Sequence, residues 1–408
     1  MKAIKIYFLP LLLLYLAIIF LAYNHKLEND ELRYVKFAHN LFHGYYSPPD
    51  HLNLWNGPGY PLLLTPFVIV KSGWLPARIL NAFLLFFAVI YFFRTLKMYL
   101  NEKAAFYISY ILGIYPPVLR DLPSLLTEIF VFFLICGFVY HFCRLGQHDG
   151  KIRFHLLISS FYLAVIALTK IIFGYVILAM MAISLIACII RRKKNMINVL
   201  YVSIIAMIFC LPYLCYTYSL TGKIFYWGNS GGMSLYWMST PYSGELGNWY
   251  DRSQVYSEPQ LYANHHKFFD RIAKLDSVRQ DEEFKKQSLK NIREHPLKYL
   301  YNWLCNVSRI LFSYPYSYKL QSPNSLFYII PNMFLLVLAT LCIYPTFKSY
   351  RNIPLEIKML LLISVIYLGG SSLLSAYGRQ LCPVIPILLL WISFTLFRLV
   401  EVRMRTPA

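Results

Sequence analysis

Three carboxylates lie beside or within apolar runs of the sequence, where they could carry out proton transfer. Glu128 lies inside a long apolar run, about 6 residues or roughly 9 Å from its nearer end at 1.5 Å per residue. A charge at the centre of a bilayer costs about 2.5–3.5 kcal/mol, so such a residue favours a wet cavity, although a packing hydrogen bond is the alternative. Asp30 and Glu31 follow the first apolar run. Either could act as a general base on a hydroxyl, or simply provide negative charge at a helix N-terminus.

Three cations occupy comparable positions next to apolar runs. Lys170 separates two such runs, Arg120 precedes Asp121 in a short turn, and Arg379 precedes the last run. Arginine offers phosphate a two-pronged contact and lysine a point charge. Snorkelling to lipid headgroups is the alternative for all three. Lys170, placed between two spans, is difficult to explain as an orientation signal.

The composition indicates that these residues are held by a membrane protein. Of the 408 residues, 58% are hydrophobic and 14% charged, and mean hydropathy is +0.49. Soluble domains carry about a quarter charged residues. The net charge of +20 resides mainly in short loops between apolar runs, as topology signals do. Because zinc spacing, an RNA-binding signature and a basic stripe are all missing from the sequence, we expect no nucleic-acid partner.

The apolar runs predict an all-α polytopic fold with about ten membrane-spanning helices. The N-terminus is expected in the cytoplasm, with an uncleaved first span. Lysine and arginine, above all the run 191–194, then fall on the cytoplasmic side. The six candidate residues fall on the opposite side. We expect a bacterial inner membrane, with an endoplasmic reticulum membrane as the alternative. The predicted spans are 3–23, 75–94, 104–119, 122–143, 154–170, 171–190, 197–218, 326–346, 356–370 and 381–398.

Three regions follow from this topology. Residues 1–218 form an N-terminal catalytic module that includes a first outer loop, 24–74. Residues 219–325 form a second outer loop, and 326–408 supply the last spans. Helical apolar periodicity over 29–42 and the short apolar stretch 60–70 predict interfacial or re-entrant helices. The stretch 262–298 is expected to be helical and 299–318 interfacial.

Six motifs in order along the chain resemble the GT-C superfamily of membrane glycosyltransferases. The likeness is to the protein O-mannosyltransferase and lipid A aminoarabinose transferase branch, which is glycosyltransferase family 39-like. The motifs are 30–63 (from Asp-Glu-Leu-Arg-Tyr to Gly-Pro-Gly-Tyr-Pro-Leu-Leu), 126–128 (Leu-Thr-Glu), 167–170 (Ala-Leu-Thr-Lys), 229–236, 291–299 and 377–386. Gln380 departs from the tyrosine usual after the arginine.

The resemblance implies a transferase with a polyprenyl-phosphate sugar donor and a lipid, glycan or protein acceptor. Asp30 would be the general base, and Glu31 and Glu128 would orient acceptor or sugar. Lys170 and Arg379, with Arg120, would stabilise the departing phosphate during a single inverting displacement. The residues require no cofactor, although Asp30 and Glu31 could hold a divalent metal. A glycan polymerase or ligase and a lipid flippase or transporter are the alternatives.

Overall fold

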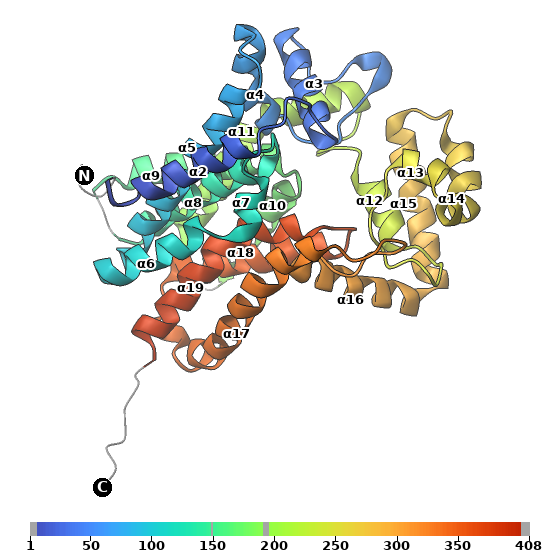
Figure 1. Cartoon of the computed structure of the whole chain (residues 1–408). Coiled ribbons are helices and arrows are strands. Elements are labelled where there is room, and N and C mark those ends of the chain that lie inside the picture. The colour runs from blue at the N-terminus through green and yellow to red at the C-terminus, as the bar shows by residue number, and fades with distance from the viewer. Residues whose placement is uncertain (1–5, 148–149, 191–195, 401–408) are drawn as a thin grey trace.

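The computed structural model describes residues 6–147, 150–190 and 196–400, which fold almost entirely into helices (Figure 1). Among these described residues, eight segments are long and apolar enough to cross a membrane, and α2 and α4 are shorter apolar helices. The long segments are α5 (Leu75–Leu96), α8 (Thr127–Leu145), α9 (Ile152–Thr169), α10 (Ile172–Ile190), α11 (Ile197–Thr221), η3 (Pro323–Ser325) with α17 (Leu326–Lys348), α18 (Leu355–Ser372), and η5 (Gly378–Val384) with α19 (Ile385–Arg398). The other helices are α2 (Leu9–Leu21), α3 (Asp30–Phe42), η1 (Pro49–His51), α4 (Gly59–Val70), α6 (Glu102–Gly113), α7 (Pro116–Asp121), α12 (Gly231–Met238), α13 (Arg252–Ser257), α14 (Pro259–Ile272), α15 (Ser277–Glu294), α16 (Pro296–Phe312) and η4 (Tyr350–Asn352).

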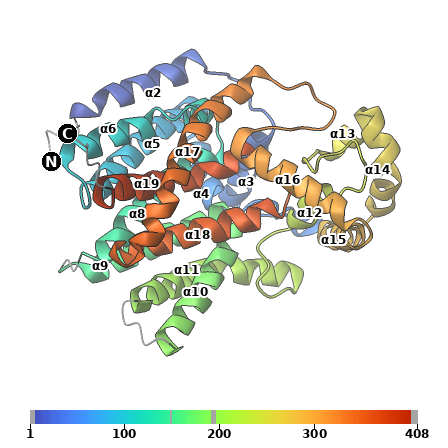
Figure 2. The same ribbon diagram turned by 90° about the horizontal axis from the view of Figure 1, so that it is seen from below.

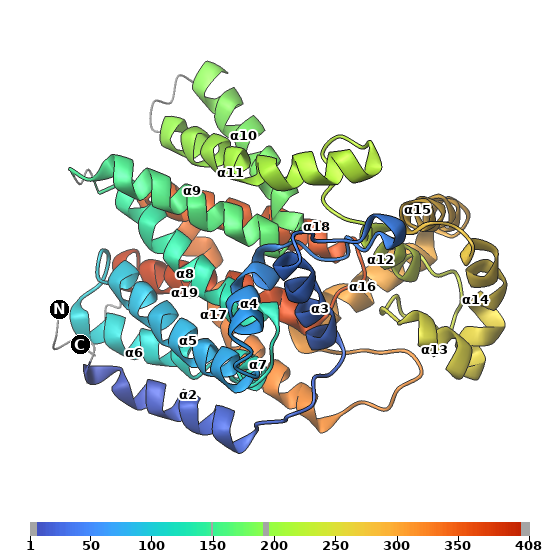
Figure 3. The ribbon, with the colours of Figure 1, turned by 90° about the horizontal axis from the view of Figure 1, so that it is seen from above.

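The helices form two packed regions. The apolar helices share one large core, which is centred on α5, α8 and α9. Helices α12 to α15, here called the loop helices, enclose a second small core around Trp237, Val255 and Phe269. Figures 1, 2 and 3 show the loop helices beside one end of the bundle, with α16 next to them. We call this end of the bundle, which also carries α3, the loop end.

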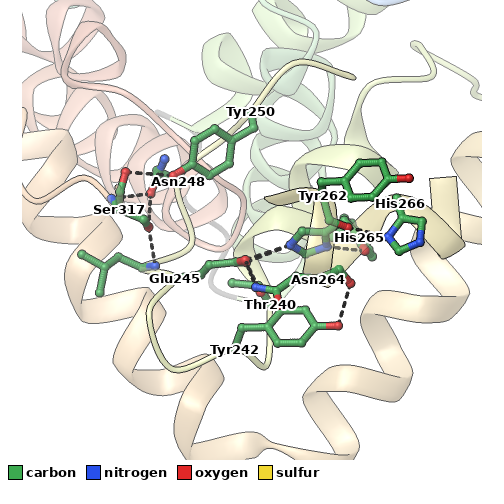
Figure 4. A network of polar contacts seen from close by, with 12 residues as sticks. Thr240, Tyr242, Glu245, Asn248, Tyr250, Tyr262, Asn264, His265, His266 and Ser317 are labelled. Atoms are coloured by element: carbon green, nitrogen blue, oxygen red, sulfur yellow. Dashed lines mark hydrogen bonds and ion pairs between the residues drawn. The ribbon is translucent and has the colours of Figure 1, made fainter. Parts of the chain in front are cut away.

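Polar contacts inside the loop helices tie their connections together (Figure 4). The Glu245 carboxylate accepts hydrogen bonds from His265 Nε2 at 2.9 Å and from Asn264 Nδ2 at 2.8 Å. It also accepts a hydrogen bond from the Thr240 hydroxyl. Hydrogen bonds from His265, Thr240 and Asn264 outweigh burial, which opposes ionisation, and so lower the pKa of Glu245.

Prolines change two of the predicted spans. The span predicted over 104–119 is divided into α6 and α7, because Pro116 and Pro117 lack the amide donors that would continue the helix. Near Pro123 the chain is again non-helical, and α8 begins only at Thr127. The predicted depth of Glu128 is therefore wrong. It lies in the first turn of α8, where negative charge suits the helix dipole.

The helices expected in the two long loops are present. Helix α3 covers 30–42 and buries Val35, Phe37 and Ala38, whereas Leu32 and Phe42, expected on the same apolar face, are exposed. Helix α4 matches the apolar stretch 60–70. The charged stretch 262–298 forms most of α14 and all of α15, and 299–318 contributes most of α16, which is not among the eight long apolar segments. The basic run 191–194 lies outside the described residues.

Candidate active site

Four of the six predicted site residues are connected by ion pairs into one network at the loop end. They are Asp30, Arg379, Glu128 and Lys170. Arg379 donates from Nη2 to Asp30 Oδ2 at 2.9 Å, and its Nε lies 3.8 Å from Glu128 Oε1. Lys170 donates from Nζ to the same Glu128 oxygen at 2.9 Å. The four residues come from α3, η5, α8 and the α9–α10 connection, which are far apart in sequence. Only the tertiary fold could bring these charges together.

Exposure differs systematically along this network. The side chain of Glu128 is 1% exposed and that of Lys170 12%, whereas Asp30 and Arg379 are 24% and 27% exposed. Glu128 is thus the buried anchor of two cations. Asp30 and Arg379 can be reached by a ligand. An anionic ligand bound here would compete with the carboxylates of Asp30 and Glu128 for Arg379 and Lys170.

The first loop positions Lys170 by close backbone contact. A Cβ on Gly57 would stand 1.9 Å from the carbonyl oxygen of Leu168, and one on Gly59 would stand 2.3 Å from Thr169 Oγ1. Only glycine therefore allows the loop to lie against the end of α9. Helix α9 ends at Thr169, and the Lys170 amide still bonds to Ile166 O at 2.7 Å. The glycines of the first-loop motif thus fix the turn that carries Lys170.

Glu31 lies in a separate set of contacts. Its Oε1 accepts from Arg78 Nη2 at 3.3 Å and from the Leu125 amide at 2.7 Å, and its Oε2 accepts from the Glu28 amide at 2.9 Å. These bonds attach α3 to the segment that leads into α8, and so set the spacing between Asp30 and Glu128. Arg78, 2% exposed, was not singled out from the sequence. A cation inside a predicted span was the signal that could have identified it.

The oxygens of the two adjacent carboxylates face cations and backbone amides. The oxygens of Asp30 accept from Arg33 and Arg379, and those of Glu31 from Arg78 and backbone amides. Among the described residues, no group of three or more His, Cys, Asp or Glu side chains could hold a metal ion. The donor set therefore does not fit a metal shared by Asp30 and Glu31.

Arg120 is also held apart from the network. It donates to Asp121 Oδ1 from Nη2 at 2.9 Å and lies over the Tyr328 ring at 5.0 Å from its centroid. Burial and the nearby charge of Glu128 raise the pKa of Asp121, although Arg120 opposes the rise. Arg120 therefore neutralises a buried acid beside the site.

Arg33 was not singled out from the sequence, although its spacing from Asp30 gave the signal. The two positions on α3 are three residues apart, which brings both side chains to one helix face. Arg33 donates to Asp30 Oδ1 and lies over the Trp55 ring at 5.2 Å from its centroid. Asp30 is therefore held from both sides, by Arg33 at one oxygen and by Arg379 at the other.

Comparison with known proteins identifies the fold. No protein-family model and no curated protein sequence matches the chain. The archaeal oligosaccharyltransferase AglB from Archaeoglobus fulgidus, in complex with an inhibitory peptide and a dolichol-phosphate, has a TM-score of 0.51 at 14% identity, covering 95% of this chain and 50% of that chain. Its apo form has a TM-score of 0.52 at 13% identity, with the same coverage.

A second solved structure matches with a lower TM-score. ArnT from Cupriavidus metallidurans, bound to undecaprenyl phosphate, has a TM-score of 0.41 at 13% identity and covers 96% of this chain and 77% of that chain. The chain spans about half the length of the oligosaccharyltransferase it resembles. The chain is therefore a multi-pass membrane protein with the fold of the GT-C membrane glycosyltransferases.

Proposed function

We propose that the chain transfers a sugar from a polyprenyl-phosphate carrier to a hydroxyl acceptor at the loop end, on the non-cytoplasmic face of the membrane. The observation that carries this proposal is the continuous network of Asp30, Arg379, Glu128 and Lys170. It combines an accessible carboxylate with two cations at one end of an apolar bundle. A lipid-borne phosphate reaches such a place while its hydrocarbon tail stays in the bilayer.

The proposed reaction is a single inverting displacement. Asp30 takes the proton from the acceptor hydroxyl while that oxygen attacks the anomeric carbon. The bond between the anomeric carbon and the phosphate oxygen breaks, and the polyprenyl phosphate leaves with the bonding electron pair. Arg379 and Lys170 stabilise the negative charge that develops on the phosphate, which is usually the largest contribution to catalysis.

The remaining predicted residues receive supporting roles in this proposal. Glu128 holds both cations in place before the donor binds, because its Oε1 faces Lys170 and Arg379. Glu31 positions α3 against the start of α8, and Arg120 compensates Asp121. Neither needs to touch the reacting atoms.

The decisive test is sugar transfer from a defined polyprenyl-phosphate donor in membranes that contain wild type or the Asp30→Asn variant. We expect the variant to insert normally and to lose transfer by at least a hundredfold, because general-base catalysis contributes about 10²–10⁴. Asp50→Asn is a matched control, since Asp50 is an exposed acid in the same loop.

Full transfer by Asp30→Asn would remove Asp30 from the base role. Movement of intact donor across the membrane by wild type, without cleavage of the sugar–phosphate bond, would contradict the transferase and favour a flippase.

A further inference from the structure

A cavity of about 260 Å³ lies between α3, the first loop and the loop helices. Its walls combine Trp55 and Phe284 with the amides Asn53, Asn229 and Gln280. An aromatic surface with a few amide groups is the usual lining of a site for small polar organic molecules. The volume falls just below the range of about 300–1,000 Å³ typical of drug-sized ligands, so the cavity suits one small ring.

Asn229, one of the lining residues, holds an unused amide donor in the wall of this cavity. Asn229 is 4% exposed, and its Oδ1 accepts from the Leu54 amide at 3.1 Å. Its Nδ2 has no hydrogen-bond partner among the described residues. A buried amide donor without a partner is unfavourable, so this N–H favours a ligand that brings an oxygen acceptor. The contacts of Oδ1 fix which way the amide faces.

The charges around the cavity cancel. Arg33 and Arg252 are balanced by Asp251 and Asp281, and Asp281 is itself paired with Lys285 at 2.6 Å. Arg33 is also paired with Asp30. A phosphate or an acidic sugar would find no excess of positive charge here, so the lining favours a neutral, polyhydroxylated ring.

The cavity adjoins Asp30 through Arg33, on the Oδ1 side of the carboxylate. Arg33 lines the cavity and donates to Asp30 Oδ1, whereas Arg379 donates to Oδ2 and Lys170 lies beyond Arg379, paired with Glu128. In an inverting displacement the attacking group approaches the face of the sugar opposite the leaving group. A group held in the cavity therefore reaches the carboxylate from the side away from the departing phosphate.

We infer that this cavity binds a neutral sugar ring of the acceptor, so that the acceptor is a glycan or a glycolipid. This inference rests on the proposed transferase function. The sugar ring stacks on the face of Trp55 that Arg33 does not cover, and Asn53, Asn229 and Gln280 exchange hydrogen bonds with the sugar hydroxyls. The acceptor hydroxyl then points toward Asp30.

The first test measures binding without catalysis, using purified full-length protein in nanodiscs. The probes are methyl glycosides of neutral hexoses, with a methyl glucuronide and inorganic phosphate as charged comparisons. We expect saturable binding of a neutral glycoside to wild type and to Asp30→Asn. Trp55→Ala should weaken this binding at least tenfold, and Trp55→Phe should retain most of it because the aromatic face remains.

Failure of every neutral glycoside to bind wild type, or preferential binding of the charged probes, would overturn the inference. Loss of transfer in Asp30→Asn would still support the transferase in that event, so the two failures are distinguishable. Unchanged binding in Trp55→Ala, with native helix content by circular dichroism, would also overturn it.

The second test separates an acceptor site from a site for the donor's sugar. In the transfer assay, Trp55→Ala is expected to raise the acceptor KM at least tenfold and leave the donor KM within twofold of wild type. A rise confined to the donor KM would assign the cavity to the donor and contradict the inference.

Discussion

Glu128 has the most constrained environment of the predicted site residues. A single oxygen of its buried carboxylate faces two cations, Lys170 and Arg379, that lie far apart in the sequence. Removing one partner from a buried ion pair leaves an uncompensated charge, which is more damaging than losing an exposed pair. The carboxylate therefore both stabilises the bundle and sets the positions of the proposed phosphate ligands.

Replacing Glu128 should consequently affect folding and transfer together. We expect Glu128→Gln to destabilise the protein by about 3–5 kcal/mol, the range for breaking a buried pair, and to lower transfer at least tenfold. Thermal unfolding in detergent and donor turnover are the measurements. Glu102→Gln is the control, because Glu102 pairs with Lys97 at the far end of the bundle and is 63% exposed. Equal behaviour of the two variants would refute this role.

At the scale of elements, α16 fixes the segment that leads into Arg379. Asn306 donates from Nδ2 to the carbonyl oxygens of Ser372 at 2.8 Å and Leu374 at 2.7 Å, and its Oδ1 accepts from the Ala376 amide at 3.0 Å. Arg309, fully buried, adds a bond to Ala376 O at 3.3 Å, and burial lowers its pKa to about 10. The sequence around Asn306 matches a glycosylation sequon, but this amide is buried and fully engaged.

Loosening this connection should displace Arg379. We expect Asn306→Ala to raise the donor KM and to lower turnover several-fold, because the proposed phosphate ligand is then less well placed. Steady-state kinetics in nanodiscs would show it. Asn324→Ala, at an exposed position in η3, should behave as wild type. A variant with unchanged donor KM would argue against positioning through α16.

The loop helices should lose stability in acid through Glu245. Its folded-state pKa is lowered, so its contribution is fully present above the ordinary glutamate pKa of about 4.3 and disappears as pH falls through the lower folded value. Tryptophan fluorescence should report this, because Trp237 and Trp249 lie in or against this small core.

The free energy of unfolding is compared for wild type, Glu245→Gln and Glu294→Gln as the pH falls from neutral to below the ordinary glutamate pKa of about 4.3. Glu294 is an exposed acid of α15 and serves as the control. We expect Glu245→Gln to be less stable at neutral pH and to lose less on acidification. Parallel acid curves for all three proteins would show that Glu245 does not contribute.

At the scale of the whole molecule, the two ends of the bundle differ in what they carry. The loop end holds the charged network and the loop helices, whereas Lys97, Glu102 and Arg398 lie at the other end, where Arg398 donates to Tyr99 O. In the predicted topology, positively charged short loops face the cytoplasm, so the end with Lys97 and Arg398 is the one expected there.

Cysteine labelling tests that orientation. In a chain with Cys188 and Cys215 replaced by serine, Asp50→Cys should react with a membrane-impermeant maleimide in intact cells. Glu102→Cys should react only after permeabilisation. The side chains of Asp50 and Glu102 are both exposed in the structure. The reverse pattern would place the loop end in the cytoplasm and contradict the proposed side of transfer.

The sequence by itself determined the class of molecule and most of the helices, because hydropathy and helix length are local properties of the chain. It also singled out Asp30, Glu128, Lys170 and Arg379, since charges beside apolar runs are costly and are retained where they have partners. Local signals that were not used, such as the spacing of Arg33 from Asp30 and the prolines at 116 and 117, would have improved the prediction.

Only the tertiary structure decided which charges meet. Asp30 and Glu31 are neighbours in the sequence, yet one faces Arg379 and the other Arg78, because successive side chains on a helix point in different directions. The cavity beside Arg33 likewise draws on α3, the first loop and the loop helices. Such contacts depend on how distant segments pack, and local propensity carries no information about that packing.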